Sequence, residues 1–413
     1  MTGTKPRLLL VSHVWPFPGN CGQQQRVALT VKALRRSFDV TFLTVAPQSE
    51  IADVSKRLMT LCDAAIILPS RYSRSIAGKL WHRTKAAAHS ARTGLRMSNY
   101  FIGKLELSPD RLLRVLNGHR FDVALFEYWH AFETAQVMRS LGIPCLLDTH
   151  DILWQSYQRD LEFIAAPEFW KRRTIAQYKE REENAWKAFD ALIAINGAED
   201  TYIREKMVGK KVFYAPMGIS LADWPYEWQP IAPPRICYYG GLGSRHNQES
   251  AIRCAQSIMP GIWKQHPTAE LWLVGSNPSS DVQALTADSR IKVPGFVAEV
   301  QPLLASMSVV LCPWSGTYGF RSRLIEVMAT GVPVVASADA VYGMGFDHGV
   351  HTYLAESDEE FTGFTLDLLS DGPSAQRRSI SARARVEEAF GFERTYGRLA
   401  ADVSQWLQLE GAA

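Results

Sequence analysis

The feature that most constrains the fold is a regular alternation of short apolar runs with segments of helical periodicity. Such an alternation predicts an α/β fold, in which parallel sheets are covered by helices. In the first half of the chain, the expected strands are Leu8–Ser12, Val40–Thr44, Ala64–Leu68, Val123–Phe126, Cys145–Asp148, Ala191–Ile195 and Val212–Ala215. In the second half, they are Ile236–Tyr239, Leu271–Val274, Ile291–Val293, Val309–Cys312 and Val332–Ala336.

The length of the chain favours two domains. With 413 residues and 46% apolar content, two domains of about 200 residues are expected rather than one. Residues 215–234 are rich in proline and tryptophan, lack periodicity and form the best linker candidate. We therefore expect a first domain at 1–215, a second at 216–390 and a terminal segment at 391–413. Two facing sheets would place their ligand crevices at the carboxyl ends of the strands, in an interdomain cleft.

Composition excludes several classes of protein. The formal net charge is only +3, so the overall electrostatics do not indicate a nucleic-acid partner. The six cysteines are scattered without a Cys-x-x-Cys pair, which indicates a reducing compartment without structural zinc or a disulfide framework. The first apolar run, Leu8–Val11, is too short for a signal peptide, and no run approaches transmembrane length. We expect a cytoplasmic protein.

The most informative segment for function is Gly319–Val335, which predicts a tight loop, a helix entered by Arg321 and Arg323, and a buried strand. A helix N-terminus presents unpaired N–H groups and partial positive charge, so it can hold a phosphate. The carboxylate of Glu326 lies one turn further in, where it can accept hydrogen bonds from hydroxyl groups such as those of a ribose. Phosphate donors and a hydroxyl acceptor on one helix suit a sugar nucleotide.

This segment closely resembles the donor-site helix of the retaining glycosyltransferases of family 4, the group 1 glycosyltransferases with the GT-B fold. One branch of that family reads Gly-Thr-Arg-Leu-Lys-Ile-Leu-Glu-Ala-Met-Ala-x-Gly-x-Pro-Val-Val here. Glu326 matches the second of two family glutamates, and the resemblance implies that it binds the ribose. The first glutamate, which contacts the donor sugar, is replaced by Tyr318. The resemblance also places Gly319 and Phe320 at the donor site.

The resemblance extends over nearly the whole chain and implies an organisation for it. The N-terminal domain would bind the acceptor, and the C-terminal domain would bind a UDP- or GDP-linked sugar. The terminal helix, expected around Thr395–Leu409, would cross back onto the N-terminal domain. Neither a metal ion nor a cofactor would be needed for this transfer.

A glycine-containing loop, Trp15–Gly22, follows the first strand and precedes a helix expected at Gln23–Arg36. A strand, a glycine turn and a helix N-terminus together can form an anion cradle, although the residues alone favour a plain turn. In the family, a double glycine here lies against the donor diphosphate. Gly22 matches the second glycine, and Cys21 occupies the first position.

Asp148, His150 and Asp151 follow another buried strand, at the edge where an open α/β sheet carries its reactive groups. Their chemistry leaves two interpretations open, a metal site and a structural histidine. The resemblance favours a third, because the family has a histidine here that faces the donor sugar and the acceptor. The later Arg181–Trp186 stretch also matches this branch of the family. On the resemblance, His150 is assigned to the reaction centre as a hydrogen-bonding group.

The loop Tyr238–Asn247 contains Gly240, Gly241 and Gly243, which permit close approach of a ligand to the backbone. Its spacing does not fit a dinucleotide-binding fingerprint. The family loop reads Gly-Arg-Leu-x-x-x-Lys, and its two cations neutralise the leaving diphosphate. Gly241 and His246 occupy those cationic positions in this chain.

Another group must therefore meet the charge of the leaving diphosphate. Arg321 and Arg323 are the candidates, with Arg245 as a third; the alternative is that all three are ordinary surface arginines. A further loop, Val293–Val297, matches one that lies against the nucleotide base and contributes Gly295 and Phe296.

Residues 64–105 contain eight lysines and arginines and no acidic residue, with large apolar side chains between them. Basic residues combined with aromatic residues suit an anionic lipid surface or a phosphorylated acceptor. The alternative is a solvated basic face. A peripheral membrane contact through residues 71–104 at the inner face of the membrane is one expectation.

The sequence thus predicts a metal-independent, retaining hexosyltransferase that uses a nucleotide sugar in polysaccharide, glycolipid or glycosylated metabolite synthesis. Two alternatives remain. One is a sugar-nucleotide epimerase of the same architecture, and the other is a non-catalytic glycosyltransferase-like partner, suggested by Tyr318, Gly241 and His246.

Overall fold

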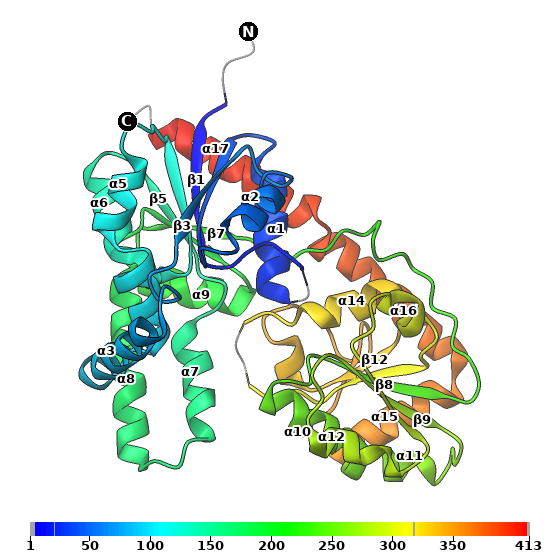
Figure 1. Cartoon of the computed structure of the whole chain (residues 1–413). Helices are drawn as coiled ribbons and strands as arrows, with labels where there is room; N and C mark the ends of the chain where they lie inside the picture. Colours follow the sequence, from blue (N-terminus) through cyan, green and yellow to red (C-terminus); the bar gives the residue numbers. More distant parts are fainter. Residues whose placement is uncertain (1–4, 20, 317–318, 411–413) are drawn as a thin grey trace. The chain divides into compact units, whose positions relative to one another are not determined.

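The computed structural model describes residues 5–19, 21–316 and 319–410. The chain forms two compact units, Met1–Met217 with Thr395–Ala413, and Gly218–Arg394. Each unit has its own parallel sheet and hydrophobic core (Figure 1). The predicted α/β class with two parallel sheets is confirmed. Tyr318 lies outside the described residues.

In the first unit, the described residues form a seven-stranded sheet with the order β3-β2-β1-β4-β5-β6-β7. Its strands are β1 (Arg7–Val11), β2 (Asp39–Ala46), β3 (Ala64–Pro69), β4 (Val123–Glu127), β5 (Cys145–Asp148), β6 (Ala191–Ala194) and β7 (Lys211–Tyr214). The helices are α1 (Gly22–Leu34), α2 (Ile51–Leu58), α3 (Ile76–Thr93), α4 (Met97–Asn99), α5 (Pro109–Leu116), α6 (Phe132–Ser140), α7 (Leu153–Glu162), α8 (Glu168–Trp186), α9 (Gly197–Lys206) and α17 (Arg398–Glu410).

Fully apolar runs form the central strands because helices cover both faces of a parallel sheet. All five residues of β4 are buried, and its Val123 is in register with Leu8 of β1. The direction of the strand order reverses between β1 and β4. In open α/β sheets, ligands bind at the carboxyl ends of the strands beside such a reversal.

The second unit repeats the scheme with six strands among its described residues, in the order β10-β9-β8-β11-β12-β13. The strands are β8 (Arg235–Tyr239), β9 (Glu270–Val274), β10 (Ile291–Gly295), β11 (Val309–Cys312), β12 (Val334–Ala336) and β13 (Tyr353–Leu354). The helices are α10 (Arg245–Arg253), α11 (Met259–Trp263), α12 (Ser280–Ala284), α13 (Val300–Ala305), α14 (Ser322–Thr330), α15 (Asp358–Ser370) and α16 (Gly372–Phe390). Here the order reverses between β8 and β11.

All of the predicted strands are present, with ends within two residues of those expected, and only the short edge strand β13 was missed. The expected linker, residues 215–234, contains neither helix nor strand, but it is packed against the protein and is not a flexible connection. Its Trp228 donates a hydrogen bond from Nε1 to the carbonyl of Met307 at 2.8 Å, so this stretch packs on the second unit. The division between the units falls at 217/218, two residues after the expected boundary.

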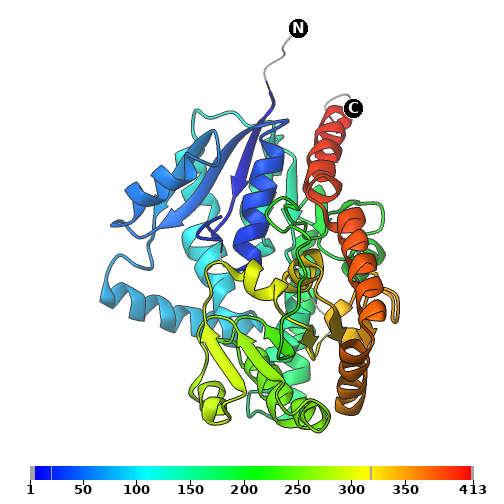
Figure 2. The same cartoon turned by 90° about the vertical axis from the view of Figure 1, so that its right-hand side faces the viewer.

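The terminal helix α17 belongs to the first unit, although it follows the second in sequence. It contacts α1 and β7 (Figures 1 and 2). The ring of Trp406 meets that of Phe213 edge-on, with 6.2 Å between the centroids. The chain returns to the first unit after Arg394, four residues later than the expected start of the terminal segment at 391.

Candidate active site

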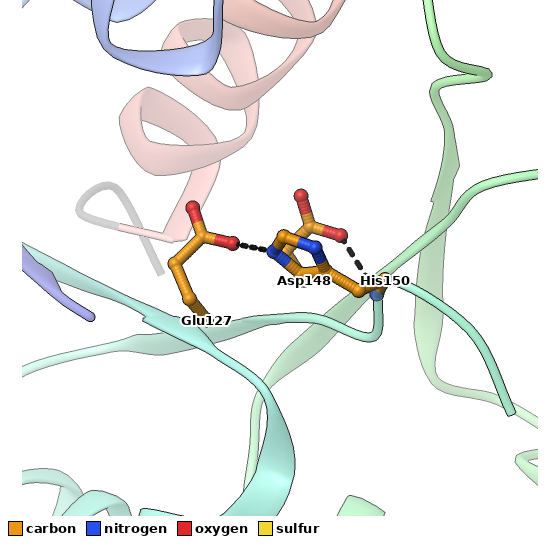
Figure 3. Close-up of side chains that lie close together, drawn as sticks. All are labelled: Glu127, Asp148 and His150. Atoms are coloured by element: carbon orange, nitrogen blue, oxygen red, sulfur yellow. Dashed lines mark hydrogen bonds and ion pairs between the residues drawn. The ribbon is translucent and has the colours of Figure 1, made fainter. Parts of the chain in front are cut away.

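Three buried polar residues meet at the carboxyl ends of β4 and β5 in the first unit. Glu127 ends β4, Asp148 ends β5, and the two residues are in register; His150 follows two positions later. One side-chain ligand atom of each lies within 4.8 Å of the others (Figure 3). The Nε2 atom of His150 is hydrogen-bonded to Oε2 of Glu127. Neighbouring strands thus bring together groups that are distant in the sequence.

Arg26 of α1 balances this acidic cluster. Its Nε lies 2.8 Å from Oδ2 of Asp148, and both side chains are almost completely buried. The same guanidinium donates through Nη1 to the carbonyl of Ala215 at 3.0 Å, which ties α1 to the segment after β7. Burial, the largest single influence, acts to lower the pKa of Arg26, but Asp148, Tyr396 and Glu127 together outweigh it and the pKa is raised. Arg26 therefore remains charged.

The arrangement bears on the metal interpretation of this segment. The clustered carboxylates are Asp148 and Glu127, whereas Asp151 is not part of the three-residue cluster. Both oxygens of Asp148 accept hydrogen bonds from Arg26. A bound cation would have to displace or approach that buried guanidinium, which repels it. The geometry favours two internal pairs, Arg26–Asp148 and Glu127–His150.

The backbone at this site is strained. His150 has φ of 59° and Tyr128 has φ of 69°, a left-handed conformation that is uncommon for residues other than glycine. Their rings stack with 4.3 Å between the centroids. The amide of His150 donates to Oδ1 of Asp148 at 3.2 Å. Strain of this kind persists only where the surroundings enforce it, and it is concentrated at functional sites.

Glu182 of α8 fixes the segment that follows His150. Its carboxylate accepts hydrogen bonds from the amides of Leu153 and Trp154, at 2.9 and 2.7 Å, at the start of α7. A carboxylate at a helix N-terminus accepts hydrogen bonds from the unpaired N–H groups and is attracted by the positive end of the helix dipole. Glu182 lies in the Arg181–Trp186 stretch noted in the sequence, and its contacts make it a positioning residue for the His150 loop.

Buried aromatic and imidazole rings surround the Glu127–His150 pair. Burial, followed by the charge of His150, lowers the pKa of His13 to about 4. Burial and the neighbouring His13 lower the pKa of His130 well below its usual range. Burial raises the pKa of Glu127, although His150 acts in the opposite direction. The pair therefore sits beside neutral imidazoles in a buried pocket of the first unit.

The loop after β1 brings Gly22 to the first position of α1. Cys21, at the N-cap, has extended backbone and does not cap the helix with its side chain. The amide of Gly19 instead donates to Oε1 of Gln24 at 3.1 Å, and Gln24 returns a bond to Phe17, so the loop folds back on its helix. Gly22 thus lies where the anion-cradle interpretation requires it.

In the second unit, Glu326 of α14 is buried beside the end of β8. Arg323 donates from Nη1 to Oε2 of Glu326 at 2.8 Å, and the hydroxyl of Tyr239 donates to the same oxygen at 3.1 Å. The Glu326 side chain is 3% exposed, whereas that of Arg323 is 28% exposed. The carboxylate is therefore held from inside the unit, and the guanidinium also reaches solvent.

Arg321 and the residues before it form the entrance to α14. Arg321 occupies the N-cap position, and its Nη2 donates to the carbonyl of Gly316 at 3.2 Å. Its guanidinium carbon lies 5.8 Å from the ring centre of Trp314, which follows β11. Gly319 has a left-handed φ of 61°, and Phe320 packs against Phe390. The loop is thus anchored through Phe320, while Arg321 lies at the helix start.

The glycine loop after β8 is packed on one side and open on the other. A Cβ atom added at Gly275 would lie 1.7 Å from the carbonyl oxygen of Gly240, so the two backbones touch there. A Cβ atom at Gly241 would meet no described atom within 4 Å. Packing within the described structure therefore does not require glycine at position 241. A ligand lying against the backbone there would require it.

Arg245 and Phe296 are exposed around this loop. Arg245 begins α10 and lies 3.2 Å from Glu249 in an exposed ion pair, which makes it a weaker candidate than Arg321 or Arg323. Phe296 follows Gly295, whose φ is 76°, and is 65% exposed. An aromatic ring left in solvent at the end of a strand offers a flat surface for a nucleotide base.

Two family profiles match the chain. Residues 21–218 match the glycosyl transferase 4-like domain, and residues 233–371 match the glycosyl transferases group 1 domain. The two matches fall in the first and second units, respectively, and together span most of the sequence. The chain belongs to the group 1 glycosyltransferases.

Solved structures agree with this assignment at the level of the fold. Sucrose-phosphate synthase from Thermosynechococcus elongatus matches with a TM-score of 0.67 at 19% identity, covering 99% of this chain and 100% of that one. Anabaena HepE in complex with UDP and glucose matches with a TM-score of 0.65 at 14% identity, covering 97% and 99%. A Staphylococcus aureus TarM mutant, solved with UDP, matches with a TM-score of 0.62 at 10% identity, covering 98% and 99%. No protein with a curated description matches significantly.

Three residues at the sites of this glycosyltransferase were missed in the sequence. Glu127 was detectable, because a carboxylate that ends an otherwise apolar strand is unusual. Arg26 and Tyr239 carried no comparable signal, since each finds its partner only through the tertiary fold.

Among the helices of the described residues, none has the length and apolar character needed to cross a bilayer.

Proposed function

We propose that this glycosyltransferase transfers a hexose from a nucleotide sugar to an acceptor hydroxyl with retention of anomeric configuration. The observation that carries the proposal is the Glu326 site. There a buried carboxylate, a partly exposed guanidinium and a helix start lie together at the reversal point of the second sheet. The structure of HepE with UDP supports a uridine nucleotide as the first donor to test.

In this proposal, Glu326 accepts hydrogen bonds from the ribose hydroxyls, and Tyr239 and Arg323 hold the carboxylate in place. Arg323 and Arg321 stabilise the diphosphate as it leaves, replacing the two family cations that are absent at Gly241 and His246. Preorganised positive charge where negative charge develops is a large contribution to such reactions. Gly22, Gly240 and Gly241 allow the backbone to approach the diphosphate, and Gly295 and Phe296 lie against the base.

The reaction proposed here needs neither a metal ion nor a protein nucleophile. The bond between the anomeric carbon and the diphosphate oxygen breaks, and the acceptor oxygen bonds to the same face of that carbon. The acceptor proton passes to the departing diphosphate. Arginine side chains supply the charge that a metal ion would otherwise provide, and their forked donors match phosphate oxygens.

We assign His150 to the reaction centre. Its Nε2 is engaged by Glu127, which leaves Nδ1 as the ring nitrogen for a hydrogen bond to the substrate. Because the imidazole is held by a carboxylate on one side and by Tyr128 on its face, its orientation is fixed before substrate binds. Its proposed role is to position sugar and acceptor hydroxyls.

The Glu127–His150 pair is the observation that favours the second candidate function, a sugar-nucleotide epimerase. An epimerase would need a carboxylate–histidine set for proton transfer, and the Glu127–His150 pair is such a set. The two functions differ in their products. A transferase releases nucleoside diphosphate and glycosylates an acceptor, whereas an epimerase converts the sugar nucleotide into its isomer without an acceptor.

The deciding experiment supplies a panel of UDP- and GDP-sugars and separates all nucleotide products by chromatography. Release of nucleoside diphosphate, reduced in Glu326→Ala and retained in an exposed control outside both sites such as Arg172→Ala, is the expected result. Isomerised sugar nucleotide would instead establish the epimerase. If no donor is consumed while the nucleotide still binds, the chain is a non-catalytic partner.

We further propose a cytoplasmic enzyme that contacts an anionic membrane through α3. The free cysteines suit a reducing compartment. Ile76, Leu80 and Trp81 of α3 are 88, 67 and 59% exposed, and Lys85 lies over the Trp81 ring at 4.8 Å. Exposed apolar side chains interleaved with basic ones suit the surface of an anionic bilayer. A lipid-linked acceptor would then be presented at that surface.

A further inference from the structure

A second feature lies at the same edge of the first sheet, where β2 and β3 end. A cavity of about 970 Å³ opens there between the residues after Ala46, the residues after Pro69 and helix α5. Its polar lining includes Gln48, Ser49, Ser70 and Ser73. None of the roles proposed above for the donor or for His150 involves this cavity.

The lining of the cavity is strongly basic. It includes four arginines, Arg71, Arg74, Arg111 and Arg114, and no acidic residue among the described residues that line it. Arg114 is largely compensated, because its Nη2 lies 2.8 Å from Asp110 in an exposed pair. Arg111 is buried and is paired with Glu106. The side chains of Arg71 and Arg74 have no hydrogen-bond or ion-pair partner within the described part of the chain.

Glu106 is engaged by the main chain of this turn and by Arg111, so it forms no ion pair with the guanidinium of Arg71. Its Oε1 accepts hydrogen bonds from Oγ of Ser70 at 2.8 Å and from the amide of Tyr72 at 2.9 Å. Its Oε2 accepts from the amide of Arg71 at 3.1 Å and from Arg111. The carboxylate is therefore fully used in folding the turn after β3. Glu106 thus binds the main-chain amide of Arg71, while the Arg71 residue also lines the cavity.

The cluster carries more positive than negative charge, because the four arginines of the lining have only Glu106 and Asp110 beside them. Burial lowers the pKa of Arg111 and the nearby positive charge of Arg71 acts in the same direction, whereas Glu106 and Asp110 act to raise it. Holding guanidinium groups close to one another costs free energy unless a negative group lies between them. A phosphate fits this arrangement best, since several of its oxygens can each accept from a guanidinium fork or a serine hydroxyl.

We propose that this cavity binds a phosphate monoester, with Arg71 and Arg74 as its principal contacts and Arg111 as the buried charge beneath. The position suggests which molecule carries the phosphate. Adjacent strands are about 4.8 Å apart, so the ends of β2 and β3, which border the cavity, lie roughly 10 and 14 Å from the end of β4, where Glu127 and His150 stand. A hexose phosphate bound on the β2 side of the cavity carries hydroxyls that can extend toward that pair.

The ligand is accordingly the phosphate-bearing acceptor, an identification that rests on the proposed function. Binding of the phosphate itself does not rest on it, because the cavity is formed entirely by the first unit. A failure of sugar transfer and a failure of phosphate binding are therefore separate results.

The test measures binding directly by calorimetry, with no donor present. The probes are inorganic phosphate, a hexose 6-phosphate and dihexanoyl phosphatidic acid below its micelle concentration. The variant Arg71→Gln with Arg74→Gln removes the two cavity arginines whose side chains lack a hydrogen-bond or ion-pair partner in the described part of the chain. The matched control, Arg172→Gln with Arg173→Gln, removes two exposed charges from α8 of the same unit. Thermal unfolding and UDP affinity verify that each variant is folded.

We expect saturable binding of at least one phosphate ester, weakened at least about tenfold in the cavity variant and less than twofold in the control. Tighter binding of the hexose phosphate points to a soluble acceptor. Tighter binding of the short-chain lipid, which has no free hydroxyl to accept a sugar, points to a lipid phosphate and overturns the identification of the ligand as the acceptor. Equal binding of all probes means that the site recognises free phosphate. The proposal is overturned if no probe binds, or if the two double variants lose the same affinity.

Discussion

The two strand-end sites handle charge in opposite ways. In the first unit, Arg26 and Asp148 are 1 and 0% exposed, and the Glu127–His150 pair beside them is nearly as buried. In the second unit, Glu326 is equally buried, but its partner Arg323 reaches solvent. A buried ion pair cannot exchange partners without leaving a desolvated charge, whereas a half-exposed one can. The first site is therefore suited to hold a fixed geometry and the second to receive an ionic ligand.

The largest effect that this comparison predicts concerns stability. Asp148→Asn leaves Arg26 buried without a counter-charge and should lower the free energy of unfolding by about 3–5 kcal/mol. Glu326→Gln should lower it far less, because Arg323 can turn to water. Urea denaturation of both variants checks this. Equal losses in the two variants would show that the sites do not differ as described.

The next effect concerns turnover at the buried site. His150→Ala removes a hydrogen-bonding group that is oriented before substrate binds, so sugar transfer should fall by about 10²–10³-fold. UDP affinity should be unchanged, because the nucleotide is assigned to the second unit. Steady-state kinetics combined with calorimetry separate the two quantities. Bound zinc in the purified enzyme that disappears in this variant would restore the metal interpretation.

At the half-exposed site, the expected loss is a rate effect of about a hundredfold for Arg321→Ala or Arg323→Ala, as for removal of one preorganised donor. Arg245→Ala is the control, since Arg245 lies in an exposed pair with Glu249. Wild-type turnover in both helix variants, together with an inactive Arg245→Ala, would move the role to the glycine loop.

A smaller change is expected in nucleotide affinity. Glu326→Ala should weaken UDP binding by about 1.5–3 kcal/mol, the range for a hydrogen bond to a charged group. The measurement is calorimetry on the folded variant. An unchanged dissociation constant would remove Glu326 from the ribose site and leave it as a structural partner of Tyr239.

The smallest effect per residue belongs to α3, whose basic side chains project from the surface helix that carries Ile76, Leu80 and Trp81. Each basic side chain near an anionic bilayer contributes about 1 kcal/mol, reduced by salt. Wild-type protein should co-sediment with anionic vesicles at low salt. Replacing Arg83, Lys85 and Arg92 by glutamine should abolish this and spare UDP binding. Failure of the wild type to co-sediment at low salt would exclude the membrane contact.

The contrast between the sites also marks what the sequence could predict. Strands were predictable because a run such as Val123–Phe126 is apolar whatever lies beside it. The buried pairs were not, because Arg26 and Asp148 are 122 positions apart and meet only once α1 packs over the sheet. Arg323 and Glu326 are three residues apart on one helix, and that spacing alone favours their contact. Tyr239 joins them only through the order of the strands.

The placement of α17 has a consequence for how the protein is made. Leu399, Val403 and Trp406 of this helix are buried, and the helix packs on α1 and β7 of the first unit. These residues leave the ribosome only after the entire second unit has been synthesised. The second unit, which is continuous in sequence from Gly218 to Arg394, can fold as it emerges. Most of the first unit is translated before the second, but its apolar surface on α1 and β7 stays uncovered until α17 is made. The first unit therefore completes its folding after the second.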